Sequence, residues 1–302
     1  MDETDVALCR LLVYNSRTPY SELAKALDTS VQNVHRRVQA LITSGSLANF
    51  NSAFSVLAVK GIWLMVHGRS GAPSVNKVLE DLKKVPGMDM AMTSTGKYMY
   101  LTGVVRDPNR IGEFVASVTR TAKLSSPEIG VVQFPLPLPG NEPVVYPMDM
   151  KLVSALSKDS RRPVTELAEE LGVAPRTVRR HIDRLNREML VHFSLELYLN
   201  RTSDLFTALH LTVKKGQELE KAAMAMIKQL ALREIITYNF GDRPEQFIVV
   251  FWSPTIGDLN ETIADLEKSG MFEEVCPNLI LDARYYDGVR ALTPPVRGKV
   301  PK

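Results

Sequence analysis

The chain contains two similar segments at a constant spacing, and this internal repeat limits its fold more than any single motif. Adding 144 to a residue number maps Asp5 onto Asp149 and Arg36 onto Arg180, and the segments align between these positions without a gap. Other matched pairs are Leu12 and Leu156, Ser16-Arg17 and Ser160-Arg161, Pro19 and Pro163, Glu22-Leu23-Ala24 and Glu166-Leu167-Ala168, Leu27 and Leu171, Val34 and Val178, and Leu41 and Leu185. Two unrelated segments would not align without a gap over this many residues by chance. The sequence therefore predicts two copies of one structural unit.

The first part of each copy has the pattern of three short helices. In the first copy, apolar residues recur at three- and four-residue intervals from Val6 onwards, as on one face of a helix. Ser21 and Ser30 stand where a hydroxyl can cap the second and third helices. The buried stripe of the third helix is expected to be Val34, Val38 and Leu41.

The second copy repeats this pattern. Thr165 is expected to cap its second helix, and Pro175 takes the first helical position of its third, where a missing amide costs nothing. The expected stripe of that third helix is Val178, Ile182 and Leu185. Two helix-turn-helix units are therefore predicted.

The spacing of apolar residues changes after the three helices of each copy. There, short apolar runs suited to strands alternate with two amphipathic helices. In the first copy, strands are expected at residues 56–67, 88–95, 98–105 and 129–134, and helices at 74–85 and 110–121. In the second copy, strands are expected at 205–213, 235–240, 246–252 and 279–285, and helices at 218–230 and 256–268. The order β-α-β-β-α-β predicts a ferredoxin-like sheet with both helices on one face.

The predicted fold class is α+β, with two winged or plain helix-turn-helix domains that are each followed by a ferredoxin-like domain. Prolines between the copies favour an extended spacer, and prolines, a glycine and basic residues at the end of the chain favour disorder. The predicted segments are a helix-turn-helix domain at 1–50, a ferredoxin-like domain at 51–134, a linker at 135–145, a second helix-turn-helix domain at 146–193, a second ferredoxin-like domain at 194–290 and a disordered tail at 291–302.

Composition and charge exclude several classes of protein. The apolar runs are far shorter than the roughly 20 residues of a membrane-spanning helix. The start of the chain, Asp2-Glu3, is unlike the basic start of a signal peptide, so we expect a cytoplasmic protein without a membrane partner. Two cysteines, Cys9 and Cys276, are too few for a zinc site, and both are expected to be buried thiols. The net charge of +3 does not by itself indicate a nucleic-acid partner.

The third helix of the first copy carries side chains suited to reading DNA. A helix-turn-helix unit lays its last helix in the major groove, so that residues near the helix start meet base edges. Amides match adenine edges and a guanidinium matches guanine. The residues expected to contact DNA in this copy are Ser30, Gln32, Asn33, His35, Arg36 and Arg37.

The corresponding helix of the second copy is richer in arginine. This helix contains five arginines and a single acidic residue, Asp183, and the excess of positive charge favours contacts with phosphates. The residues expected to contact DNA here are Arg176, Thr177, Arg179, Arg180 and Arg184. The alternative is a solvated charged face, which the occurrence of the whole motif twice disfavours. Because the two outward faces differ, the expected partner is double-stranded DNA with non-identical half-sites.

Three helices followed by β-α-β-β-α-β resemble the Lrp/AsnC (feast/famine) family of transcription regulators, as a tandem duplication that covers nearly the whole chain. The positions that carry the resemblance in the first copy are Asp5, Leu12, Arg17, Glu22-Leu23-Ala24, Leu27, Ser30, Val34, Arg37-Val38, Leu41 and Gly45. The second copy departs from the pattern at Ala174, in place of the cap serine, and at His181, in place of the arginine that matches Arg37. The resemblance implies sequence-specific DNA binding, pairing of the ferredoxin-like sheets within the chain, and a homo-oligomer, a dimer or higher, that associates through the ferredoxin-like sheets.

The resemblance also implies an effector site in the ferredoxin-like part, for an amino acid or a related small molecule. The family's glycine-loop motif corresponds to residues 95–99, with Met99 where the ligand-holding acid would stand, and to residues 240–244. The effector contacts that follow are Gly96, Tyr98, Gly241 and Asp242. From the residues alone, both glycines are expected to supply a positive φ between paired strands.

Catalytic motifs are absent from the sequence. The five histidines show no metal-ligand spacing and there is no glycine-rich phosphate loop, so we expect no metal, no cofactor and no enzymatic activity. His67 and His210 are expected to be structural. Siroheme decarboxylases share the architecture of this family and use histidine and arginine around a tetrapyrrole. The corresponding strands of this chain, at residues 88–105 and 235–252, contain no histidine and a single arginine, Arg243. That enzyme is the first alternative, and an adaptor that uses these folds for protein contacts is the second.

Overall fold

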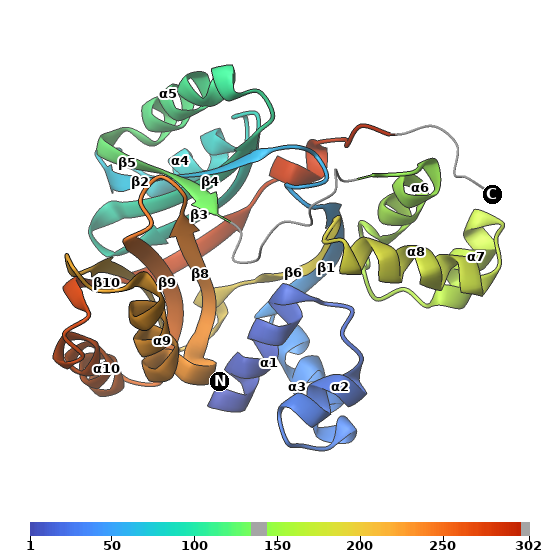
Figure 1. The fold of residues 1–302 in the computed structure, drawn as a ribbon, viewed down its shortest axis with the longest axis horizontal. Helices are drawn as coiled ribbons and strands as arrows, with labels where there is room; N and C mark the ends of the chain where they lie inside the picture. Colours follow the sequence, from blue (N-terminus) through green and yellow to red (C-terminus); the bar gives the residue numbers. More distant parts are fainter. Residues whose placement is uncertain (134–143, 297–302) are drawn as a thin grey trace.

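The chain folds into two three-helix heads, a two-stranded ribbon and a closed barrel covered by helices (Figure 1). The computed structural model describes residues 1–133 and 144–296. The first head consists of α1 (Glu3–Tyr14), α2 (Tyr20–Ala26) and α3 (Val31–Thr43), and the second head consists of α6 (Pro147–Leu156), α7 (Val164–Leu171) and α8 (Pro175–Arg187). Among the described residues, no helix is long and apolar enough to cross a membrane.

The helix starts in the heads confirm one predicted cap and correct two. The Ser30 hydroxyl accepts a hydrogen bond from the Asn33 amide at 3.1 Å, as predicted for α3. The caps predicted at Ser21 and Thr165 are wrong, because α2 and α7 begin earlier, directly after Pro19 and Pro163, without a side-chain cap. The proline ring fixes φ near −60° and so sets the direction in which the chain enters the helix.

A two-stranded antiparallel ribbon, which the sequence did not predict, joins the heads to the barrel. It consists of β1 (Leu47–Phe54) and β6 (Val191–Leu197). The strand predicted at residues 56–67 is wrong at its start, because residues 55–61 form a turn closed by a hydrogen bond from the Gly61 amide to the Val56 carbonyl at 2.8 Å. The asparagine and serine residues of β1 hide its apolar alternation, and its partner strand lies far along the chain.

The remaining strands and helices come in two sets, each in the order β-α-β-β-α-β. The first set is β2 (Ile62–Ser70), α4 (Val75–Leu82), β3 (Met88–Ser94), β4 (Tyr98–Val105), α5 (Ile111–Ala122) and β5 (Leu124–Gln133). The second set is β7 (Leu205–Val213), α9 (Leu219–Leu230), β8 (Glu234–Phe240), β9 (Gln246–Ser253), α10 (Ile256–Lys268) and β10 (Phe272–Tyr285). Short 3₁₀ helices lie within the sets at η1 (Thr95–Lys97), η2 (Pro108–Arg110) and η4 (Ala231–Arg233), before the second set at η3 (Leu199–Arg201) and after it at η5 (Gly288–Ala291).

All eight of these strands form one closed barrel in the order β10-β3-β4-β2-β5-β8-β9-β7. The two sets meet at two seams, which are the antiparallel pairings of β5 with β8 and of β10 with β3. Among the described residues, which on this strand end at Gln133, the β5–β8 seam has two residue pairs, Val132 with Phe240 and Gln133 with Asn239. It is lengthened by the Gly241 amide, which donates to the Val131 carbonyl at 2.9 Å.

Apolar residues on the two faces of the barrel strands belong to different cores. Residues of β2–β4 pack under α4 and α5 in one outer core, and residues of β7 and β9 pack under α9 and α10 in another. The inner faces of strands from both sets form a third core inside the barrel, and this core continues into the first head. The closed barrel therefore buries apolar side chains on both faces of its strands.

The two heads are attached to the barrel differently. The first head shares its core with the barrel interior, and Arg10 of α1 forms an ion pair with Glu234 of β8 at 3.2 Å. The second head has a separate core that includes residues of β1, β6 and η5 (Figure 1). The barrel therefore holds the first head directly, while the ribbon and the η5 region hold the second.

Three further expectations differ from the structure or lie partly outside it. Cys9 is buried as predicted, but Cys276 is exposed on β10. In the tail expected at 291–302, Val296 pairs with Val145 in an isolated bridge, and residues 297–302 lie outside the described residues. Most of the linker expected at 135–145 also lies outside them.

Candidate DNA-binding interface

Helix α3 turns its apolar stripe inward and most of its predicted DNA contacts outward. Val34, Val38 and Leu41 are buried as predicted. The exposed residues among the predicted contacts are Ser30, Gln32, His35 and Arg36, and Asn33 is partly buried. A short chain of hydrogen bonds orients the helix start: Arg36 Nη2 donates to Asn33 Oδ1 at 2.8 Å, and Asn33 Nδ2 donates to Thr29 Oγ1 at 2.8 Å. An amide and a guanidinium are thus held side by side at the end of α3 that meets base edges in such units.

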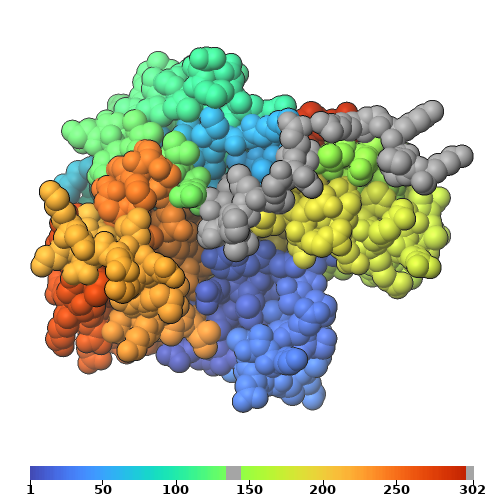
Figure 2. Space-filling view, viewed as in Figure 1, coloured from blue at the N-terminus to red at the C-terminus, as the bar shows by residue number. Residues whose placement is uncertain are grey.

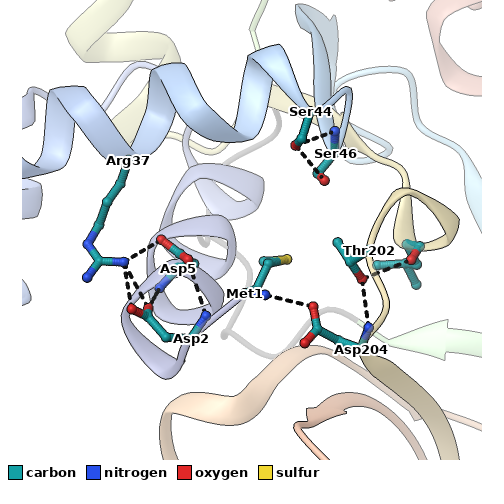
Figure 3. A network of polar contacts seen from close by, with 9 residues as sticks. Met1, Asp2, Asp5, Arg37, Ser44, Ser46, Thr202 and Asp204 are labelled. Carbon is teal, nitrogen blue, oxygen red and sulfur yellow. Dashed lines mark hydrogen bonds and ion pairs between the residues drawn. The ribbon is translucent and has the colours of Figure 1, made fainter.

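Arg37, by contrast, reaches Asp2 and Asp5 and so holds α3 to the start of α1 (Figure 3). Its Nη1 atom lies 2.8 Å from Asp2 Oδ2 and 2.7 Å from Asp5 Oδ1. The hydrogen bond with Asp5 is the main reason that the pKa of Arg37 is raised. The side chain is therefore engaged within the head, and contact between Arg37 and DNA stays a prediction. Figure 3 also shows the Met1 amino group 2.9 Å from Asp204 Oδ2, next to β7.

Helix α8 exposes three arginines near its start. Arg176, Arg179 and Arg180 are exposed, and within residues 1–133 and 144–296 the structure gives them no ion pair or side-chain hydrogen bond. Ala174 provides no side-chain cap, Pro175 has no amide hydrogen, and the Thr177 amide donates to the Ala174 carbonyl at 2.8 Å, which leaves the Arg176 amide of the first turn without a capping hydroxyl. A free first-turn amide and the positive end of the helix dipole favour anions. Arginines and helix start together form a cationic surface suited to phosphates.

The other end of α8 is held by a buried carboxylate. Asp149 of α6 is fully buried, and its Oδ1 atom lies 2.6 Å from His181 Nδ1. Its second oxygen accepts a hydrogen bond from Arg184, which also donates to Glu188 at 2.8 Å and to the Val144 carbonyl at 3.0 Å. Arg184, a predicted DNA contact, is thus engaged inside the head. His181 completes the buried stripe of α8 where Ile182 was predicted, and Ile182 is only partly buried.

The predicted effector residues lie in two separate hairpins. Gly96 in the β3–β4 turn has the predicted positive φ, at 66°, and the Tyr98 hydroxyl lies 2.8 Å from His67 Nδ1. Gly241 in the β8–β9 turn is not among the residues with positive φ, so the φ predicted there is wrong. The next residue, Asp242, accepts a hydrogen bond from the Val131 amide at 2.9 Å. Gly241 and Asp242 therefore close the β5–β8 seam in this structure.

A cluster of histidines and tyrosines inside the barrel was missed by the sequence reasoning. The His67 and His210 rings are 5.4 Å apart, between the opposite strands β2 and β7. His210 Nε2 lies 2.7 Å from the Tyr100 hydroxyl, to which Asn278 Nδ2 donates at 2.8 Å. Burial lowers the pKa of His67 to about 3. One signal was available: each histidine is the sixth residue of its strand.

No metal centre adds to these features in the part of the chain that the structure describes, where no three histidine, cysteine, aspartate or glutamate side chains are grouped as metal ligands.

Comparisons with known proteins match the two heads and the overall architecture separately. The AsnC-type helix-turn-helix domain matches residues 1–42 and 147–186. The HTH-type transcriptional regulator LysM of Saccharolobus solfataricus is 28% identical over 121 residues, which are 40% of this chain and 80% of LysM. An uncharacterized HTH-type transcriptional regulator of Pyrococcus furiosus is 31% identical over 114 residues, 35% of this chain and 72% of that protein.

Among solved structures, the siroheme decarboxylase NirDL has a similar overall fold. Its TM-score is 0.58 at 10% sequence identity, and the match covers 96% of each chain. At this identity the likeness concerns the fold alone. The similarity to transcriptional regulators lies instead in the AsnC-type helix-turn-helix match and in the regulators that resemble part of the chain. On these matches, the chain belongs to the Lrp/AsnC family of helix-turn-helix transcriptional regulators.

Proposed function

We propose that this chain is a sequence-specific transcriptional regulator that binds two non-identical half-sites of double-stranded DNA with α3 and α8. The proposal treats it as a tandem duplication, with two helix-turn-helix heads and two ferredoxin-like bodies, and assigns it no catalytic step. One observation carries the proposal: the exposed faces of α3 and α8 occupy matched positions in the two heads but differ in chemistry.

The two helices have different tasks in this proposal. The exposed Gln32 and the paired Asn33 and Arg36 of α3 offer the amide and guanidinium groups that read adenine and guanine edges. The exposed Arg176, Arg179 and Arg180 of α8 offer cations without a carboxylate partner in the described chain. A larger share of the binding free energy at the α8 half-site therefore comes from phosphates, which makes that half-site more sensitive to salt.

Selection of bound sequences from random duplex DNA, with the purified full chain, tests the proposal. We expect two unequal half-sites in the enriched sequences. Replacing Arg36 or Arg180 with alanine is expected to cost about 1–3 kcal/mol at one half-site only, as measured by mobility shift. The absence of any enriched sequence contradicts the proposal, and a palindrome with equal half-sites contradicts its two-surface form. If binding to random DNA does not weaken as the salt concentration rises, the result favours an adaptor that uses these folds for protein contacts.

Regulation by an amino acid or a related small molecule, and association of chains into a homo-oligomer, extend the proposal. The positive-φ turn at Gly96 and the partly exposed Tyr98 support an effector site in the first hairpin. Exposed apolar residues of α9, Met224 and Ile227, support association through that helix. Thermal shifts of the full chain with each amino acid test the first extension, and light scattering tests the second. An unchanged melting temperature with every amino acid contradicts the first extension. A molar mass equal to that of one chain contradicts the second.

Tetrapyrrole decarboxylation is the second candidate function. The whole-chain likeness to siroheme decarboxylase NirDL and the pair of His67 and His210 inside the barrel favour it. Against it, the hydrogen bonds of this cluster are made within the cluster, and His67 is only 2% exposed. Adding siroheme to the purified chain and recording the absorption spectrum decides between the transcriptional regulator and the decarboxylase. An unchanged spectrum removes this candidate.

A further inference from the structure

The loops that join the first two helices of each head meet each other at matched positions of the repeat. Ser16 and Ser160, which are 144 residues apart, are both fully buried, and their hydroxyl oxygens lie 2.6 Å from each other. Each loop is also tied to the ribbon: the Ser16 amide donates to the Phe193 carbonyl at 2.8 Å, and the Ser160 amide donates to the Phe50 carbonyl at 3.0 Å. Figure 2 shows the surfaces of the first head, in blue, and the second head, in yellow, in contact.

The arginines that follow these serines exchange hydrogen bonds between the heads. Arg17 of the first head donates to the carbonyls of Ser160 and, at 3.2 Å, of Arg162. Arg161 of the second head donates to the carbonyls of Ser16 and, at 3.3 Å, of Thr18. We call this set of contacts the head joint. It is reciprocal, since each guanidinium binds the backbone of the other head.

Aromatic rings and burial hold both guanidiniums in place. The Arg161 guanidinium lies 4.4 Å from the centre of the Tyr20 ring, and that of Arg17 lies 5.7 Å from the centre of the Phe193 ring. Burial is the main reason that the pKa of each arginine is lowered. Buried cations are costly unless every donor has a partner. The carbonyls that satisfy Arg17 and Arg161 come from the opposite head, so separating the heads leaves charges and carbonyls without partners.

We propose that Arg17 and Arg161 are positioning residues that fix the distance and the angle between α3 and α8, and so restrict the target DNA to one spacing of half-sites. The inference rests on the proposed function. Inserting one base pair between half-sites shifts the second by about 3.4 Å and rotates it by about 35° around the duplex. Heads that move relative to each other can still bind both half-sites after this shift and rotation. Heads that are held by the head joint cannot.

A spacing series measures this effect. The probes are duplexes that carry the selected half-sites with zero to five inserted base pairs, and a duplex that carries one half-site. For the wild-type chain, we expect affinity to fall at least tenfold when one to three base pairs are inserted. For the double variant Arg17→Gln/Arg161→Gln, we expect a fall of less than threefold, with single half-site affinity within twofold of wild type. A variant that keeps the steep spacing profile overturns the inference.

The lysine variant Arg17→Lys/Arg161→Lys separates charge from geometry. Lysine keeps the positive charge but cannot present the planar fork of guanidinium donors. We therefore expect it to lose spacing discrimination as the glutamine variant does. A lysine variant with the wild-type profile shows that charge alone sets the spacing and overturns the assigned role. If a double variant does not fold, as judged by circular dichroism, the single variants are used, since each keeps one half of the joint.

A distance measurement without DNA separates this inference from the proposed function. Spin labels are placed at the exposed positions Gln39 of α3 and Arg187 of α8, as Gln39→Cys and Arg187→Cys, in a chain that also carries Cys276→Ser. We expect a narrow distance distribution in this background and a broad one when Arg17 and Arg161 are also replaced by glutamine. A narrow distribution with no sequence-specific binding rejects the proposed function but keeps the joint. An equally narrow distribution in the folded variant rejects the joint.

Discussion

Asp5 and Asp149 occupy matched positions in the two heads but hold α3 and α8 through different side chains. In the first head, Arg37 binds Asp5 together with the neighbouring Asp2. In the second head, histidine replaces that arginine, and Arg184, from the next turn of α8, supplies the cation instead. The second head therefore keeps an ion pair between its first and third helices after losing the family's arginine, and its carboxylate is the more deeply buried of the two.

Replacing Asp149 with asparagine is expected to destabilise the second head by about 3 kcal/mol, because Arg184 and His181 lose a buried anionic acceptor. The matched change Asp5→Asn is expected to cost about 1 kcal/mol or less, since Asp2 still binds Arg37 in a more exposed setting. Hydrogen exchange of α8 and α3 amides measures the two effects separately. Equal losses in the two heads contradict this explanation.

His67 is expected to make the barrel sensitive to acid. Its pKa is lowered to about 3 by burial, against about 6.5 in an unfolded chain, so the unfolded state binds the proton more readily between these values. Stability is therefore complete above pH 6.5 and is lost as the pH falls toward 3. The linkage relation gives a loss of about 2 kcal/mol between pH 7.5 and pH 5.

Urea unfolding followed by tryptophan fluorescence measures this loss, because Trp63 and Trp252 lie on barrel strands. The variant His67→Gln keeps a polar group near Tyr98 but does not titrate. It should lose about 2 kcal/mol less than the wild-type chain over the same pH range. Parallel curves for the two chains rule out His67 as the source of the acid sensitivity.

Helices α3 and α8 begin with the same backbone conformation but with different caps. Ser30 and Ala174 both have extended dihedral angles, −83° and 151° against −70° and 145°. The hydroxyl of Ser30 accepts a hydrogen bond from an amide of α3, whereas the matched amide of α8, that of Thr177, donates to the Ala174 carbonyl. At the scale of the element, α3 thus has a side-chain cap and α8 has none, and the Arg176 amide of α8 is left for an anion from outside the chain.

Exchanging the caps tests this difference. Ser30→Ala is expected to destabilise the first head by about 1 kcal/mol. Ala174→Ser is expected to stabilise the second by only about 0.5 kcal/mol, because the Thr177 amide already donates to the Ala174 carbonyl at 2.8 Å. Thermal unfolding of the single and double variants measures both changes. If Ala174→Ser also weakens DNA binding, an amide at the start of α8 is contacting phosphate.

At the scale of the whole molecule, closure of the barrel depends on the two seams. The β10–β3 seam joins five residue pairs, and the described part of β5, which ends at Gln133, joins two pairs with β8. At the β5–β8 seam, Asp242 binds the Val131 amide, and Arg243 donates to the Ile129 carbonyl at 2.7 Å. Side chains of the β8–β9 turn thus add contacts to the strand pairing at this seam.

Removing the Asp242 carboxylate is expected to loosen this seam without unfolding the barrel. In Asp242→Ala, the Val131 amide loses a charged acceptor, and a loss of about 1.5 kcal/mol corresponds to roughly tenfold faster exchange of that amide. Hydrogen exchange measured by NMR checks this. Amides of β3, at the other seam, serve as the internal control. Unchanged exchange at Val131 would mean that the seam is held by its strand pairing alone.

The sequence predicted what depends on local patterns and missed what depends on distant pairing. The three helices of each head and most barrel strands follow from apolar periodicity and caps such as Ser30. The ribbon and the cluster around His67 and His210 did not follow, because their partners lie in the other half of the chain. For the candidate interface, periodicity identified which side of α3 faces outward, but it did not show that Arg37 and Arg184 bind carboxylates within their own heads.

Both heads belong to one covalent chain, and for the proposed function this determines how the occupancy of a DNA target depends on the amount of protein. Two separate subunits must first find each other, so at low copy number their joint occupancy of a site rises with the square of subunit concentration. Two heads on one chain are always present together, at an effective concentration set by the fold rather than by expression. Occupancy of a target by a single chain then rises in direct proportion to its copy number, and unlike subunits cannot mix to form a mismatched pair.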